Sequence, residues 1–113
     1  MLYMAPEIFE KEGDASVYEG PVDMWAAGVI MYQLVSGKVP FSTTDLREKV
    51  LNDEPSFYSS RWSPMSHEAK DLCRKLLDKS PVKRITAKDA LKHPFFEVLQ
   101  DKKESESPEL KRL

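Results

Sequence analysis

The side chains that most often carry out chemistry are scattered along this chain of 113 residues. Aspartate, glutamate and lysine are plentiful, but no carboxylate pair and no histidine cluster has the spacing of a metal or nucleophile site. The four glycines, Gly13, Gly20, Gly28 and Gly37, are seven to nine residues apart, so the sequence lacks the G-x-G-x-x-G loop that cradles phosphates. We therefore predict no catalytic, cofactor-binding or metal-binding residue in this chain.

Charge and cysteine content exclude several classes of function. Seventeen basic and nineteen acidic side chains give a net charge of −2, so no global field favours nucleic acid or an anionic membrane surface. Cys73 is the single cysteine, which rules out an internal disulfide, and the first residues lack the basic and then apolar segment of a secretory signal. We expect an intracellular, cytoplasmic protein with no nucleic-acid partner and no membrane partner.

The elements that would position any site are helices, because almost nothing in the sequence alternates with period two. A first short helix is predicted from Ala5 to about Lys11. The next is predicted from Pro21 to about Val35, with Ser36 and Gly37 as its stop. Its stretch MWAAGVIMYQLVSG is shorter than the ~20 apolar residues of a membrane span, so a buried core helix is favoured over a membrane helix. Apart from one glutamine, this helix is apolar on every side and expects protein all around it.

A short helix and a loop are predicted to follow this core helix. Thr43 or Thr44 is expected to cap a short helix that carries Leu46, Val50 and Leu51 on one side. Residues 52–64 form a loop that we expect three aromatic side chains to pin to the core: Phe57, Tyr58 and Trp62.

Two capped helices should follow this loop. Ser66 is the predicted cap of an amphipathic helix, and Thr86 opens a capping box with Asp89 in a helix that runs through Leu91. Phe95 and Phe96 should then dock on the core, while the charged segment 100–113 is predicted to be a disordered tail. The buried side of the first of these helices has helical spacing: Ala69, Leu72, Cys73, Leu76 and Leu77.

Three stretches carry a resemblance to one family. In order and at ordinary spacing, the chain resembles the C-terminal half of the large lobe of eukaryotic Ser/Thr protein kinases in MAPE, in DMWAAGVIMYQLVSGKVPF and in PVKRITAKDALKHPFF. The likeness covers Leu2 to about Leu99 and is greatest to calcium/calmodulin-dependent and calcium-dependent kinases. It implies an all-α fold, a partial kinase domain over residues 1–99, and a tail over residues 100–113.

The resemblance also implies roles for individual residues. It gives Glu7 a buried ion pair with Arg84, which ties the activation segment to the later helices, although Arg84 taken alone reads as a solvated neighbour of Lys83. It makes Asp23 an acceptor of backbone N–H groups of the catalytic loop, where local sequence alone suggests a carboxylate at a helix start. Trp25 and Gly28 would pack beneath the activation segment, as they also would in any buried helix.

The substrate-binding residues that the resemblance implies are the first of the matched segment. Leu2, Tyr3 and Met4 correspond to the loop that receives the substrate residue after the phosphoacceptor, and the alternative is that they are frayed terminal residues. Protein substrates and the missing remainder of the kinase domain are the expected partners.

Phosphoryl transfer in this family needs parts that the sequence does not contain. The H-R-D motif is absent, because His67 precedes Glu68 and His93 precedes Pro94, and the sequence contains no D-F-G either. ATP and Mg²⁺ would therefore be bound by the full-length parent enzyme, and this chain alone is predicted to be inactive.

Two functional hypotheses follow. The chain is either part of an ATP-dependent serine/threonine kinase of intracellular signalling, through a shortened reading frame or an alternative start, or a non-catalytic interaction module derived from one. An unrelated helical protein is a remaining alternative.

Overall fold

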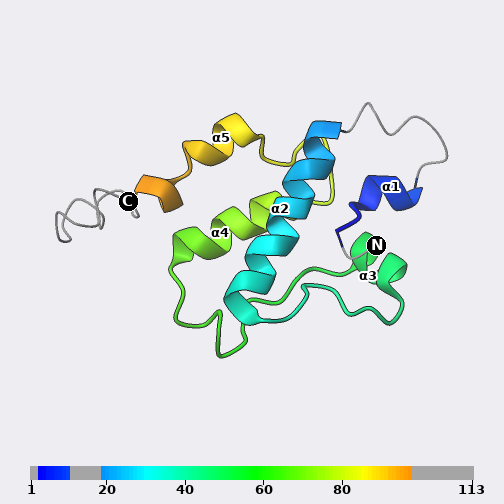
Figure 1. The fold of residues 1–113 in the computed structure, drawn as a ribbon, viewed down its shortest axis with the longest axis horizontal. Helices are drawn as coiled ribbons and strands as arrows, with labels where there is room; N and C mark the ends of the chain where they lie inside the picture. Colours follow the sequence, from blue (N-terminus) through cyan, green and yellow to red (C-terminus); the bar gives the residue numbers. More distant parts are fainter. Residues whose placement is uncertain (1–2, 11–18, 98–113) are drawn as a thin grey trace.

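The computed structural model of the chain describes residues 3–10 and 19–97 (Figure 1). These residues form helices and connecting loops with no β-strand among them, which agrees with the predicted all-α part of a kinase lobe. Within the same residues, no helix is long and apolar enough to cross a membrane. The expected end of the first helix at Lys11 and the predicted tail over residues 100–113 lie outside the described residues.

Helix α2 (Glu19–Ser36) lies across the middle of the molecule, and α4 (His67–Leu76) packs against it (Figure 1). Helix α2 begins at Glu19, before the predicted start at Pro21. Proline is tolerated there because the first N–H groups of a helix have no intrahelical partner. The helix stops as predicted at Ser36, where Gly37 takes a left-handed φ of 74° and its N–H donates to the Gln33 carbonyl at 2.8 Å.

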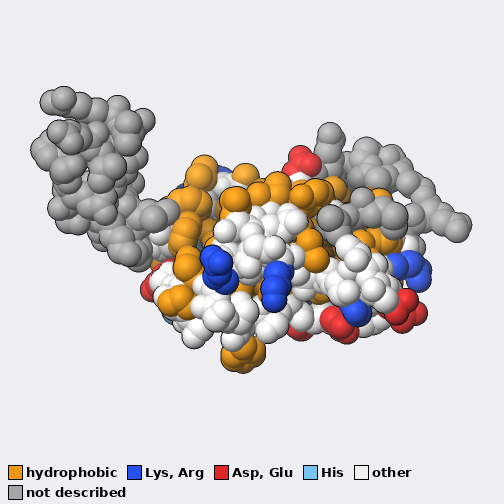
Figure 2. Space-filling view, turned by 60° about the horizontal axis from the view of Figure 1, so that its bottom comes forward, with side chains coloured by type: hydrophobic (Ala, Val, Ile, Leu, Met, Phe, Trp, Pro, Cys, Tyr) orange, Lys and Arg blue, Asp and Glu red, His pale blue; other side chains and the backbone are white. Residues whose placement is uncertain are grey.

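Only one side of α2 is covered by the described residues. Trp25, Val29 and Tyr32 are buried in the main core cluster, whereas Ile30 is half-exposed and Leu34 is 81% exposed. In the space-filling view, hydrophobic side chains gather in a band along the upper edge of the molecule (Figure 2). The all-round apolar character of this helix therefore leaves apolar surface exposed in this chain.

Helix α1 (Pro6–Glu10) packs against α3 (Leu46–Asn52), and both helices contribute side chains to the main core cluster. The prediction that Thr43 or Thr44 caps α3 is wrong. Asp45 occupies the cap position with a left-handed φ of 54° and makes no side-chain capping bond. Its carbonyl accepts the Lys49 N–H at 3.1 Å, so the helix starts one residue later than a Thr44 cap would give and two later than a Thr43 cap would give.

The loop before α4 is held by two aromatic residues rather than three. Phe57 and Trp62 are buried and meet edge to face, with ring centroids 4.8 Å apart. Tyr58 is 91% exposed, so its expected docking is wrong. Successive side chains of an extended segment point to opposite sides, and Phe57 takes the inward position.

Both predicted caps of the later helices are present. The Ser66 hydroxyl accepts the Ala69 N–H at 3.1 Å at the start of α4, and the Thr86 hydroxyl accepts the Asp89 N–H at 3.2 Å at the start of α5 (Ala87–Leu91). All five residues predicted for the inner side of the first of these helices are buried: Ala69, Leu72, Cys73, Leu76 and Leu77.

The chain after α5 is fixed by a buried histidine. His93 Nε2 lies 2.7 Å from Asp71 Oδ2 on α4, and His93 Nδ1 accepts the Phe95 N–H at 3.0 Å. Because Nδ1 accepts, Nε2 carries the proton and donates to the carboxylate. Phe95 packs as predicted on a second core cluster, formed by Leu72, Leu76 and Ala90. Phe96 is exposed, so the expectation that it docks on the core is wrong.

This contact predicts an acid-dependent contribution to stability. The hydrogen bond from His93 and the ion pair with Lys75 hold the pKa of Asp71 below its ordinary 3.8, although burial opposes them. The stabilisation is therefore present above pH 3.8 and is lost as the pH falls through the lowered pKa. We expect Asp71→Asn to flatten the pH dependence of the unfolding free energy, measured by urea denaturation from about pH 5 to about pH 2.

The matched control for this experiment is Asp89→Asn, which changes an exposed carboxylate on α5. It should keep the wild-type pH dependence. Equal slopes for the wild-type chain and Asp71→Asn would contradict the assignment.

Candidate functional site

Arg84 is placed by the turn that joins α4 to α5. The Ser80 carbonyl accepts the Arg84 N–H at 2.9 Å, and the Asp78 carboxylate accepts the Ser80 N–H at 2.9 Å. These local bonds close a tight turn after α4. They direct the Arg84 side chain inward, where its guanidinium meets Glu7 on α1 and the Pro21 carbonyl near the start of α2.

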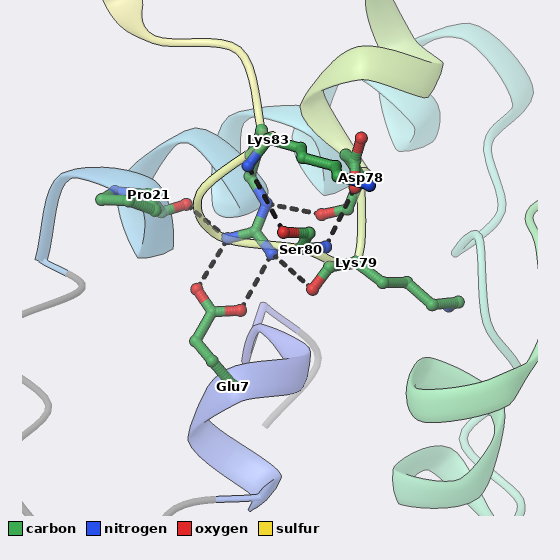
Figure 3. Close-up of polar contacts among 7 residues, drawn as sticks. Glu7, Pro21, Asp78, Lys79, Ser80 and Lys83 are labelled. Carbon is green, nitrogen blue, oxygen red and sulfur yellow. Dashed lines mark hydrogen bonds and ion pairs between the residues drawn. The ribbon is translucent and has the colours of Figure 1, made fainter.

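The guanidinium of Arg84 uses all five of its N–H donors. Two of them bind Glu7 side by side, at 2.7 Å to Oε2 and 2.8 Å to Oε1 (Figure 3). The other three donate to backbone carbonyls, at 2.8 Å to Pro21, 2.7 Å to Asp78 and 3.4 Å to Lys79. One side chain thus joins α1, α2 and the α4–α5 turn.

Both members of this ion pair are 3% exposed. A bidentate arginine–carboxylate pair is short and directional, and here the buried charges also have backbone partners. The pair inferred from the resemblance is confirmed as a contact, and the alternative of a solvated Arg84 is wrong. We refer to Glu7 and Arg84 together as the anchor.

Trp25 and Gly28 lie on the buried side of α2, and Trp25 also contacts Arg84 of the anchor. The Trp25 ring stacks on Phe41 with centroids 5.8 Å apart, and the Arg84 guanidinium lies 5.0 Å from its centroid. Gly28 allows α2 and α4 to approach closely, because a Cβ built there would lie 2.8 Å from Leu76 Cβ. The Cys73 thiol donates to the Gly28 carbonyl at 3.6 Å, and burial raises the pKa of this thiol to about 12.

The remaining predicted site residues are Leu2, Tyr3, Met4 and Asp23. Tyr3 is 45% exposed and Met4 is partly buried, one turn before Glu7, whereas Leu2 lies outside the described residues. Asp23 is exposed on α2 and is not in the first turn, because the helix starts earlier than predicted. It borders a hollow of about 430 Å³ between the start of α2 and residues 81–87.

The anchor fixes the geometry of the residues around it. The anchor donors are all used, and no three His, Cys, Asp or Glu side chains lie together as a metal site within residues 3–10 and 19–97. Its chemical capacity is therefore to hold residues 3–7 in a defined place against α2.

Comparison with known proteins identifies what this framework belongs to. The sequence model of the protein kinase domain family matches residues 1–96. The chain belongs to this family. It is 50% identical over 97 residues to a calcium/calmodulin-dependent protein kinase type I of Schizosaccharomyces pombe, an alignment that covers 83% of this chain and 28% of the relative.

Two other kinases are similar in sequence to this chain. The delta subunit of calcium/calmodulin-dependent protein kinase type II from Oryctolagus cuniculus is 44% identical, over 83% of this chain and 17% of that protein. Calcium-dependent protein kinase 11 of Oryza sativa subsp. japonica is 45% identical, over 82% of this chain and 16% of that protein. The resemblance to this group of Ser/Thr kinases is confirmed, and the chain spans less than a third of the length of these relatives.

Two polar contacts of this kinase domain had no signal in the sequence. Lys79 donates to Val50 on α3, 29 positions away in the sequence, and His93 binds Asp71 on α4, 22 positions away. Nothing in the local pattern around Lys79 or His93 distinguishes them from surface residues.

Proposed function

We propose that this chain is the substrate-side part of the large lobe of a serine/threonine protein kinase. The observation that carries the proposal is the anchor, which holds Ala5-Pro6-Glu7 against α2 and the α4–α5 turn through all five donors of Arg84. Leu2, Tyr3 and Met4 are proposed to contact the protein substrate in such a kinase. Trp25, Gly28 and Asp23 belong to the helix that supports this segment.

ATP and Mg²⁺ are proposed to bind the remainder of the kinase. The residues described here do not supply a metal site, and the sequence has no G-x-G-x-x-G, H-R-D or D-F-G motif. We therefore derive no catalytic step within this chain, and we propose that it does not transfer phosphate alone.

The exposed side of α2 is the proposed contact with that remainder. Ile30 and Leu34 are large apolar side chains on a helix whose opposite side is already buried, and exposed apolar patches mark interaction surfaces. The same surface supports the alternative function, a non-catalytic module that binds a kinase-derived partner.

The proposal is tested by grafting. Residues 1–96 of this chain, which match the kinase domain family, replace the corresponding segment of the Schizosaccharomyces pombe relative, to which the chain is 50% identical over 97 residues. We expect the graft to phosphorylate a peptide substrate with Mg²⁺-ATP at a kcat/KM within about tenfold of the parent, because the framework that holds the substrate segment is retained. The 113-residue chain alone should show no transfer.

Two variants of the graft distinguish the outcomes. Leu34→Lys should leave the stability of the isolated chain within about 0.5 kcal/mol, because Leu34 is exposed there, yet destabilise the graft by more than that. A graft that folds and binds ATP without transferring phosphate would refute the kinase role. An unchanged graft stability in Leu34→Lys would refute the assigned contact.

A further inference from the structure

Lys79 makes two contacts that point in different directions. Its backbone carbonyl accepts an N–H of Arg84 at 3.4 Å, and its side chain donates to the Val50 carbonyl at 2.6 Å. Figure 3 shows this side chain extending away from Glu7, toward the helix at the right of the view. Val50 lies in the last turn of α3, so a single residue links the anchor to a helix 29 residues earlier in the chain.

The end of α3 needs such a partner. The last carbonyls of a helix have no intrahelical N–H, and a cation there also complements the helix dipole. Helix α3 has seven residues and no side-chain bond at its N-cap, so its own hydrogen bonds are too few to hold it in place. Two of the α3 carbonyls are bonded locally, that of Glu48 by the Asn52 amide at 3.1 Å and that of Lys49 by the Asp53 N–H at 2.8 Å. The Lys79 ammonium adds a donor to the Val50 carbonyl from a distant part of the chain.

Two aromatic rings connect Lys79 with Arg84 a second time. The ammonium lies 4.8 Å from the Phe41 centroid and 5.9 Å from that of Trp25, and Arg84 lies 5.0 Å from the same Trp25 ring. Phe41 and Trp25 stack with an interplanar angle of 8°. Both cations thus rest on one stacked pair of rings.

Burial and the neighbouring carboxylates act in opposite directions on the Lys79 ammonium. Burial lowers the pKa of Lys79, while Glu54 and Asp53, just beyond α3, oppose that shift. At the backbone of Lys79, one Arg84 nitrogen donates both to the Lys79 carbonyl and to Glu7 Oε1. The carboxylates therefore lie on the α3 side and on the anchor side of the same turn.

From these contacts we infer that Lys79 is a positioning residue that couples α3 to the Glu7–Arg84 anchor. The coupling goes beyond the proposed function, because it depends on contacts within this chain and not on phosphoryl transfer. A displacement of α3 would be felt at the anchor through Lys79, and a broken anchor would loosen α3.

The test is native-state hydrogen exchange of the 113-residue chain. Lys79→Met keeps the aliphatic stem and removes the donor and the charge. We expect the hydrogen-exchange rates of the Lys49 and Asp53 amides, which close α3, to rise about tenfold. The exchange rate of the Leu77 amide at the end of α4 should change by no more than about twofold, because the effect is local. The control is Lys75→Met, an exposed lysine on α4, which should leave the α3 amides unchanged.

Coupling to the anchor is measured by repeating the substitution in a Glu7→Gln background. The fold-change at the α3 amides should then shrink, because the two substitutions act on one connected set of contacts. An equal fold-change in both backgrounds would overturn the coupling, and equal acceleration of α3 and α4 would reduce Lys79 to a general stabiliser.

A measurement on the wild-type chain covers the case in which Lys79→Met does not fold. The ε-methylene protons of Lys79 should be shifted upfield of those of the other lysines by the Phe41 ring, with nuclear Overhauser contacts to Val50. Lys79 signals that coincide with those of exposed lysines would overturn the inference.

Discussion

Arg84→Ala is expected to lower the free energy of unfolding of this chain by about 3–5 kcal/mol, the cost of leaving a buried charge without its partner. Glu7 is 3% exposed and accepts both of its charged hydrogen bonds from Arg84. The substitution also leaves the carbonyls of Pro21 and Asp78 without that donor. Urea denaturation followed by tryptophan fluorescence measures the change, since Trp25 lies against the guanidinium.

The control for this experiment is Lys83→Ala, the adjacent exposed basic residue. It should change the unfolding free energy by no more than about 0.5 kcal/mol. In the kinase graft, Arg84→Ala should reduce kcat/KM while Lys83→Ala leaves it unchanged. A stability loss below about 1 kcal/mol for Arg84→Ala would show that the anchor is not what holds residues 5–7.

Gly28→Ala is the second substitution with a large expected effect. The new Cβ would lie 2.8 Å from Leu76 Cβ and 2.9 Å from Leu77 Cδ2, so α2 and α4 would have to separate. Overpacking of this kind costs about 1–3 kcal/mol. The gain of about 1 kcal/mol in helix propensity offsets only part of that cost. We expect a lower thermal midpoint, measured by circular dichroism.

Gly20→Ala is the matched control, because the same substitution in the first turn of α2 meets no atom within 4 Å. It should be neutral or should stabilise the chain by up to about 1 kcal/mol. If Gly28→Ala raised the midpoint as much as Gly20→Ala, the close approach of α2 and α4 would not be a feature of the folded chain.

Helix positions and their caps were readable from the sequence. Ser66 and Thr86 cap as predicted, and the inner side of α4 follows its apolar spacing, because these signals act within one or two turns. The exceptions are places where neighbouring residues could take the same position. Asp45 replaces Thr43 or Thr44 as the cap of α3, and Phe57 takes the inward position that leaves Tyr58 exposed.

The sequence by itself determined the helices of this protein, its family and, through the resemblance, the pairing of Glu7 with Arg84. Only the tertiary structure decided that Arg84 uses every donor, that Lys79 reaches α3 and that His93 meets Asp71. Those contacts join residues 22 or more positions apart, or use backbone carbonyls that no side-chain pattern reports. The physical reason is that helix signals act over a few residues, whereas a long-range hydrogen bond depends on the path of the whole chain between its partners.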